Sequence, residues 1–559
     1  MGTVGTATRL ALKGESTGSR AALQLAAGGA SDVRSLEVRL GDELLPRISG
    51  NRWRSPQLTT TTHSMVGFTW TRTGRDADIA ISSRIAGSWT GWQRVPVLHD
   101  RPEGEAGAQQ IIGTELTWIG ETDGIQVRVA GERPADLTLV LLYPGARPGD
   151  GVATSIPRFS VGEAAENAGS GTVPRPVILT RNDWGADESW RDGQPRTNPT
   201  IQQVHVHHTA NSNDYAESDV PALIRGMYRY HTKSLGWSDL AYNFVVDQFG
   251  HIWQGRAGGA ARAVRGAHTL GFNASSCGVA VIGNYDLVAP SSVAVRAVVE
   301  LSAWKLDRYD RDPSGVIDVV SEGSDRYAAS ENVSLPVIDG HRDTNDTACP
   351  GELLYGALPR IRRRAKRRIE RAQAPPPITI VQASVVFGLP RLGQVISVTP
   401  GVFDPSDSVA AYAWLRDGVA IAGAMAASYT TVPKDLGRLL TVRVDISKPG
   451  FAPASERLSV AGPVTALPVV VVRPVGKRGR AVIHVTVKVP GLIGEVKGRV
   501  TVRLRARTMK LKLVDGRAVA RFRDLGRRDY TVTVDYHGRG AIAPAQLVSA
   551  VHIRKPRAD

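Results

Sequence analysis

Three of the chain's twelve histidines lie in one short stretch, VHVHHTA, at residues 204–210. The alternation of valine with histidine predicts a β-strand, in which successive side chains point to opposite faces. His205 and His207 then share one face, and His208 lies on the other. Two histidines on one face can bind a metal together, or each can make structural hydrogen bonds. The stretch alone leaves both interpretations open.

A second group of candidate ligands lies in DGHRDTNDTACPG, where His341 and Cys349 are separated by a loop of small polar residues. Imidazole nitrogen and thiolate sulfur are the ligands that zinc prefers, and three protein ligands with a free fourth position are typical of a catalytic zinc site. The other cysteine, Cys277, begins the apolar run CGVAVIG and is expected to be a buried, inert thiol. Two cysteines allow one disulfide at most, which excludes a disulfide scaffold.

Alternating helices and strands are expected to position these residues. Apolar residues at helical spacing predict a helix in SDVPALIRGMYRYH, with Ser218 as its N-cap, and another in SSVAVRAVVELSAWKLDRYD. The stretches IQQVHVHHTA, AYNFVVDQFG and CGVAVIGNYD read as strands, and a basic helix begins near Arg360 and ends before APPP. This order predicts an α/β domain, a mixed β-sheet flanked by helices, at residues 174–373.

The segments on either side predict β-structure, so we expect a multidomain protein with the α/β domain central between β-sandwich domains. Short alternating strands such as SLEVRL, ADIAISSRI, ELTWIG and IQVRVAG indicate the first sandwich. Trp89 and Trp92 near a turn there could stack on a sugar or pack at a strand edge. The expected divisions are a flexible segment at 1–34, a β-sandwich-like domain at 35–147, a linker at 148–173, a Pro-rich linker at 374–378, an immunoglobulin-like domain at 379–465 and a basic β-sandwich at 466–559.

The charge is concentrated at the C-terminal end. The chain has a net charge of +16, and residues 466–559 hold 21 Lys and Arg against six Asp and Glu. This excess of positive charge favours an anionic partner. The alternative is that the basic side chains only form a solvated surface.

No apolar run approaches the roughly 18 to 20 residues that cross a bilayer, so we expect no transmembrane segment. The first 34 residues show no apolar core of a secretory signal. No nucleic-acid recognition motif is present, so nucleic acid is not expected as a partner.

Four stretches in order, VHHTA, GWSDLAYNFVVDQFGHIWQGR, GAHTLGFNASSCGVAVIGNY and HRDTNDTACPG, resemble the peptidoglycan recognition protein (PGRP) and type-2 amidase superfamily. The added β-rich segments make the arrangement similar to multidomain actinobacterial N-acetylmuramoyl-L-alanine amidases. The resemblance implies Zn²⁺ as the cofactor. Matched position by position, it implies the metal ligands His207, His341 and Cys349, the catalytic residues Tyr242 and Thr347, and the substrate-binding residue His268.

The resemblance also implies the reaction. It is the zinc-dependent hydrolysis of the amide between N-acetylmuramic acid and the L-alanine of the peptidoglycan stem peptide, by a secreted protein associated with the cell wall. The alternative is a peptidoglycan-binding protein without activity. Members that only bind typically lack the cysteine ligand, so Cys349 favours catalysis. Peptidoglycan or a muropeptide is the expected partner, and the basic C-terminal domain is expected to add binding to anionic wall polymers.

Overall fold

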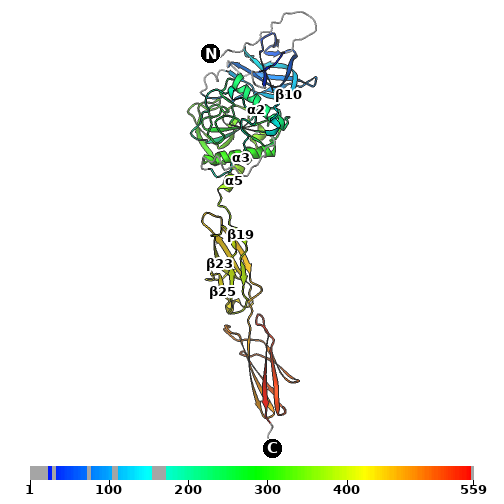
Figure 1. Ribbon diagram of the computed structural model, residues 1–559, viewed down its shortest axis with the longest axis vertical. Coiled ribbons are helices and arrows are strands. Elements are labelled where there is room, and N and C mark those ends of the chain that lie inside the picture. Colours follow the sequence, from blue (N-terminus) through cyan, green and yellow to red (C-terminus); the bar gives the residue numbers. More distant parts are fainter. Residues whose placement is uncertain (1–22, 28–32, 72–76, 104–110, 154–170, 555–559) are drawn as a thin grey trace. The chain divides into compact units, whose positions relative to one another are not determined.

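The computed structural model describes residues 23–27, 33–71, 77–103, 111–153 and 171–554 (Figure 1). Most of the expected flexible segment 1–34, and most of the expected linker 148–173, lie outside these residues. The chain divides into two compact units, Met1–Gln373 and Ala374–Asp559. This division comes at the start of the APPP stretch, where proline ends the preceding helix. The boundaries expected inside each unit remain predictions.

The predicted α/β fold is built on a five-stranded mixed sheet in the order β14-β13-β15-β12-β18. Strand β12 is an inner strand and runs parallel to its neighbours β15 and β18. Strand β13 is also parallel to β15, while β14 pairs with β13 in the antiparallel sense. The strand bounds are β12 Gln203–His208, β13 Phe244–Val246, β14 Ile252–Gln254, β15 Ser276–Val281 and β18 Ile338–Gly340. A separate hairpin consists of β16 Val316–Val320 and β17 Asn332–Pro336.

Helices cover both faces of this sheet. The long helices α3, Ser292–Arg308, and α5, Leu358–Gln373, pack on each other (Figure 1) and share one apolar core with Val204 and Val206 of β12. Because side chains alternate along β12, His205 and His207 point to the opposite face. Shorter helices are α1 Asp150–Ala153, α4 Glu352–Tyr355, and the 3₁₀ turns η1 Glu188–Trp190, η2 Glu217–Asp219 and η4 His341–Asp343.

The helix predicted around SDVPALIRGMYRYH is present, with different ends. Helix α2 spans Val220–Arg229 and continues as a π-helical turn, η3, Tyr230–Ser234. Ser218 is not its N-cap, because the 3₁₀ turn η2 precedes the helix and Asp219 stands at the cap position. Helix α3 lies closer to its predicted range. Its N-cap is Ser291, whose side chain accepts a hydrogen bond from the backbone N–H of Ala294. AYNFVVDQFG forms a shorter strand than predicted, and Tyr242 precedes it.

Strands β1 to β11 form one connected eleven-stranded sheet. The stretches ELTWIG and IQVRVAG, predicted as two strands, lie on one long strand, β10. Its first part pairs with β5, and its second part pairs with β4 and β6. Register shifts between Trp118 and Gly124 let one strand serve two sets of neighbours. The bounds are β1 Ala26–Ala27, β2 Val33–Arg39, β3 Arg47–Ser49, β4 Arg52–Arg54, β5 Leu58–Thr71, β6 Asp78–Ile85, β7 Ser88–Trp89, β8 Gln93–Val95, β9 Ile111–Gly113, β10 Thr117–Ala130 and β11 Thr138–Pro144.

A single hydrophobic core joins this eleven-stranded sheet to the α/β fold. Met65, Val140 and Leu142 of the sheet belong to the same buried cluster as Leu223 and Ile224 of α2. Polar contacts reinforce the junction: the Arg225 guanidinium forms a two-pronged ion pair with Asp150, at 2.7 Å for each bond. The N-terminal sheet and the α/β fold therefore share buried surface that neither would cover alone.

The second unit, Ala374–Asp559, consists of antiparallel strands around two cores. Trp414 is fully buried in the first core, as expected for a central tryptophan. The immunoglobulin-like topology remains a prediction.

No helix in the described ranges is both long and apolar enough to cross a membrane. The element bounds are β19 Thr379–Gln382, β20 Val385–Phe387, β21 Val395–Thr399, β22 Val402–Asp404, β23 Val409–Arg416, β24 Val419–Ala420, β25 Ser428–Thr430, η5 Pro433–Asp435, β26 Leu440–Ser447, β27 Ala454–Ser459, β28 Val469–Lys477, β29 Arg480–Lys488, β30 Arg499–Leu504, β31 Arg507–Lys512, β32 Arg517–Phe522, β33 Arg528–Tyr536 and β34 Ala545–Ile553.

Candidate metal centre

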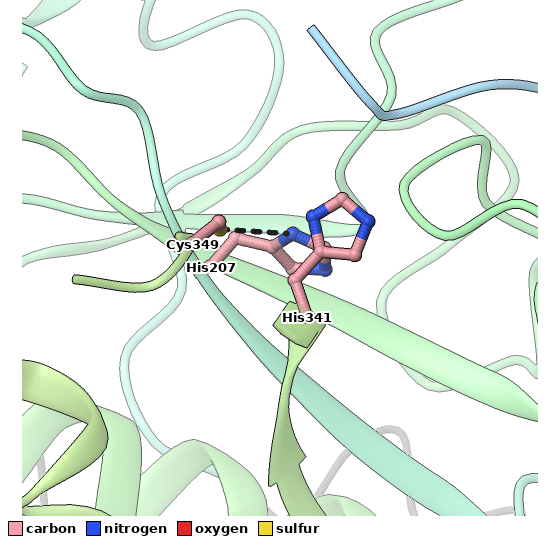
Figure 2. A group of neighbouring side chains, drawn as sticks. All are labelled: His207, His341 and Cys349. Atoms are coloured by element: carbon pink, nitrogen blue, oxygen red, sulfur yellow. Dashed lines mark hydrogen bonds between the residues drawn. The ribbon is translucent and has the colours of Figure 1, made fainter. Parts of the chain in front are cut away.

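Three of the predicted site residues meet at the C-terminal end of strand β12. One ligand atom each from His207, His341 and Cys349 lies within 4.8 Å of the other two, and all three side chains are buried. Figure 2 shows the two imidazole rings and the sulfur turned toward one another. The Cys349 Sγ atom is 3.7 Å from Nδ1 of His207. Tetrahedral zinc with bonds of about 2.0 to 2.3 Å places its ligand atoms at comparable separations.

Strand register brings these residues together from distant parts of the chain. Val206 of β12 pairs with Gly340 of β18 in a parallel ladder, so His207 and His341 both follow that pair at the same end of the sheet. Cys349 arrives from the loop after β18. Its sulfur accepts a hydrogen bond from the backbone N–H of His208, at 3.4 Å. The position of each ligand is thus fixed by backbone pairing before any metal binds.

Burial sets the protonation of the three groups. Loss of solvent lowers the pKa of His207 and of His341 well below the usual value, so both imidazoles are neutral, as metal ligation requires. Burial also raises the pKa of the Cys349 thiol well above its usual value. A cation beside the sulfur favours the thiolate, because opposite charge offsets the desolvation of the anion.

The donor set suits zinc. Two imidazole nitrogens and one sulfur are borderline and soft ligands, whereas Mg²⁺ and Ca²⁺ select oxygen. Three protein ligands leave one coordination position for water, a substrate or another protein group. The residues present therefore fit a zinc ion.

His268 lies behind His207. Its side chain is fully buried, and its Nδ1 atom is 3.1 Å from Nε2 of His207. When Nδ1 of His207 holds a metal ion, Nε2 is the protonated nitrogen and donates a hydrogen bond to Nδ1 of His268. His268 Nε2 in turn faces the Ser276 hydroxyl, at 3.5 Å. Contact of His268 with substrate remains a prediction, while its hydrogen bond to His207 orients the ring of a candidate metal ligand.

His205 does not join the three ligands. Its Nδ1 atom is 2.5 Å from Asp339 Oδ1, and both side chains are fully buried. Burial raises the pKa of the Asp339 carboxyl to about 6, while the adjacent imidazole opposes that shift. The same-face pair His205 and His207 in VHVHHTA is therefore divided: His205 contacts Asp339, and His207 belongs to the cluster of candidate ligands.

Tyr242 and Thr347, the predicted catalytic residues, each lie close to one of the clustered residues. The centroid of the Tyr242 ring is 5.4 Å from that of the His207 ring. Burial raises the pKa of Tyr242 well above 10, so the hydroxyl is a hydrogen-bond donor. Thr347 is partly buried, and its hydroxyl accepts a hydrogen bond from the backbone N–H of Cys349, at 3.2 Å. Thr347 thus shapes the turn that presents the sulfur, and its catalytic role remains a prediction.

One acidic residue enters the site from the N-terminal sheet and was not predicted. Asp100 Oδ1 is 3.6 Å from Nδ1 of His207 and 3.3 Å from Nδ1 of His341. Its other oxygen accepts a 2.5 Å hydrogen bond from the Tyr242 hydroxyl. Burial raises the pKa of the Asp100 carboxyl to about 8. The stretch LHDRPEG carries no signal of this contact, because the contact depends on how two sheets pack.

Two parts of the chain match known protein families. Residues 196–352 match the family model described as N-acetylmuramoyl-L-alanine amidase. Residues 49–154 match the family model described as Rv3811 N-terminal galactose-binding domain-like. The first match contains all three clustered ligands, and the second contains Asp100.

Individual relatives match about a third of this chain. The chain is 26% identical to peptidoglycan-recognition protein SC2 of Drosophila melanogaster over 187 residues, which cover 33% of this chain and 84% of that relative. It is 31% identical to the N-acetylmuramoyl-L-alanine amidase of Homo sapiens over 220 residues, covering 37% of this chain and 33% of that relative. The solved structure of wild-type Drosophila PGRP-LB is 26% identical, covers 33% of this chain and 92% of that chain, and has a TM-score of 0.26.

Proposed function

Because the chain contains a domain of the type-2 amidase and peptidoglycan recognition protein superfamily, we propose that it is a zinc-dependent peptidoglycan hydrolase. The proposed reaction is hydrolysis of the amide between N-acetylmuramic acid and the L-alanine of the stem peptide. The supporting observation is the convergence of His207, His341 and Cys349 within 4.8 Å. A protein that only bound muropeptide would have no use for a buried cluster of two imidazoles and a thiol.

The chain's own residues supply most of the proposed mechanism. A zinc ion held by the three ligands would act as a Lewis acid toward the scissile carbonyl and toward water. The Tyr242 hydroxyl, once free of its present partner, donates a hydrogen bond to the carbonyl oxygen as negative charge develops there, a contact often worth about 3 to 4 kcal/mol. His268 holds the His207 ring in the orientation that ligation requires. Thr347 keeps Cys349 in position and contributes a hydroxyl near the reacting groups.

The substrate is a cell-wall polymer, so we propose that the protein acts outside the cell membrane, as a secreted protein associated with the wall. The strongly basic segment 466–559 supports a second contact, with anionic wall polymers such as teichoic acids or with peptidoglycan carboxylates. Such binding concentrates the enzyme on its substrate and weakens as salt screens the charges.

Digestion of purified cell wall tests the proposed reaction. The zinc-loaded full chain should release new L-alanine amino termini without new reducing sugars, and a chelator should abolish the release. Reducing ends without new amino termini would identify a glycosidase. If the Asp100→Ala form also releases neither product with zinc present, the protein is a binding module.

A further inference from the structure

A short strap from the N-terminal sheet lies across the candidate metal centre. The strap is the segment Leu98–Glu103, which follows β8, and Asp100 is at its middle. The backbone of Leu98 is tied to its own sheet by a 2.9 Å hydrogen bond to the carbonyl of Gly113. The next five residues extend over the α/β fold, so the N-terminal sheet delivers Asp100 to the site.

Contacts on both sides of Asp100 hold the strap on the α/β fold. On one side, His99 Nδ1 is 3.4 Å from Asp325 Oδ2. On the other side, Asn273 donates to the Arg101 carbonyl at 3.0 Å and to the Glu103 carboxylate at 2.8 Å. Glu103 also accepts a hydrogen bond from the backbone of Gly271. These anchors lie outside the metal-ligand cluster, so the contacts of Asp100 are one of several sets that hold the strap on the α/β fold.

The two oxygens of Asp100 meet two different parts of the proposed machinery. Oδ2 accepts a hydrogen bond from the Tyr242 hydroxyl, the donor that the reaction needs for the substrate carbonyl. Oδ1 is buried, has no hydrogen-bond partner among the residues that the structure describes, and faces Nδ1 of both His207 and His341. An unpaired carboxylate oxygen buried beside two imidazole nitrogens is costly unless a cation lies between them. With a zinc ion held by His207, His341 and Cys349, this oxygen would be available as a fourth ligand.

With the strap in place, a muropeptide cannot reach these groups. The side chains of Asp100 and His341 are 2% exposed and that of His207 is 0% exposed. Tyr242 is also buried, and its hydroxyl is already occupied. The amide of a polymeric substrate must contact both the metal and Tyr242, so the strap must leave first.

We propose that Asp100 is the fourth zinc ligand of a latent form of the enzyme, in which the strap excludes water and substrate from the metal. This inference rests on the proposed zinc amidase function. Displacement of the strap is enough to open the site. The rest of the N-terminal sheet does not have to move, because it stays attached through the core that it shares with α2. Activation then replaces the Asp100 carboxylate with water and frees the Tyr242 hydroxyl.

Cobalt-substituted full-length protein tests the ligand directly, with thiocyanate as the probe. In the wild type, thiocyanate should leave the visible d–d spectrum of the cobalt ion nearly unchanged, because no exchangeable position is available. In Asp100→Ala, thiocyanate should shift the spectrum saturably, at a concentration at least about tenfold lower than any that affects the wild type. Amidase activity should rise by a similar factor, because the form that can bind substrate is no longer a minor population. Glu103→Ala, which removes an anchor without touching the metal, should move both readouts in the same direction.

Asp123→Asn is the matched control, since this carboxylate belongs to the same sheet, is 59% exposed and pairs with Arg84. It should behave as the wild type. Equal thiocyanate shifts in the wild type and Asp100→Ala would overturn the inference. Lower activity of Asp100→Ala with an unchanged spectrum would also overturn it, because Asp100 would then take part in catalysis. If neither protein binds one metal ion per chain, the proposed zinc function itself fails.

Discussion

At the scale of single residues, Cys349 is the proposed metal ligand whose loss tests the proposed function most directly. We predict that Cys349→Ala lowers zinc affinity and amidase activity together, each by more than about 100-fold, because one of three protein ligands is lost. Cys277→Ala removes the only other cysteine, which is buried at the start of β15, and should retain both properties. Metal content after dialysis and release of L-alanine amino termini measure the two effects. Retained activity in Cys349→Ala would rule out the proposed ligand set.

His268 is predicted to act through His207. We expect His268→Ala to weaken zinc binding by about 10- to 100-fold, the usual cost of losing a partner that orients a metal ligand. The KM for a soluble muropeptide, measured with saturating zinc, should stay within about twofold of the wild type. A large rise in KM with unchanged zinc affinity would instead support the substrate contact implied by the resemblance.

The sequence was informative about residues that lie within one local pattern. Alternation along VHVHHTA correctly separated the face of His207 from that of His208, and the polar loop around Cys349 indicated a ligand rather than a core thiol. Asp100 could not be found in this way. Its chemistry comes from loss of solvent and from neighbours more than 100 residues away, and nothing in LHDRPEG encodes either.

At the scale of elements, the π-helical turn η3 joins the α/β fold to the N-terminal sheet. Its Tyr230 hydroxyl donates to the backbone carbonyls of Phe68 and Thr114, at 2.8 and 2.9 Å. We predict that Tyr230→Phe lowers the free energy of unfolding of the first unit by about 1 to 2 kcal/mol, because buried carbonyls lose a partner. Denaturant titration measures this change.

Tyr143→Phe provides the control for that measurement. Tyr143 lies in the same N-terminal sheet, and its hydroxyl donates to an exposed carboxylate, that of Glu121, at 2.6 Å. Water replaces such an exposed partner, so we expect a change of less than about 0.5 kcal/mol. Equal effects of the two substitutions would mean that Tyr230 does not bridge the two parts.

The type of each long element followed from the sequence, while the limits and partners of the elements did not. Helical spacing was sufficient for α2 and α3, but the π-helical turn after α2 reflects packing of Tyr230 against the N-terminal sheet. The division of β10 between two sets of neighbours depends on register shifts, which alternation of apolar residues does not reveal.

For the whole molecule, we predict that chemistry and wall attachment belong to different units. A shortened protein ending at Gln373 should cleave a soluble muropeptide with the same kcat/KM as the full chain. Its binding to purified wall at low salt should fall by at least about tenfold, because the basic segment 466–559 is gone. Sedimentation with wall at several salt concentrations measures this loss. Unchanged low-salt binding would exclude the anionic-polymer contact.

The core shared by α2 and the N-terminal sheet determines where this protein can be cut. Removal of everything before residue 174 would uncover the side of α2 that carries Leu223 and Ile224 and leave Arg225 without Asp150. Such a fragment would aggregate through its exposed apolar patch although it contains every predicted ligand. A shortened lytic protein derived from this chain should therefore keep the N-terminal sheet. A substitution in the strap, rather than removal of the sheet, should then make it active.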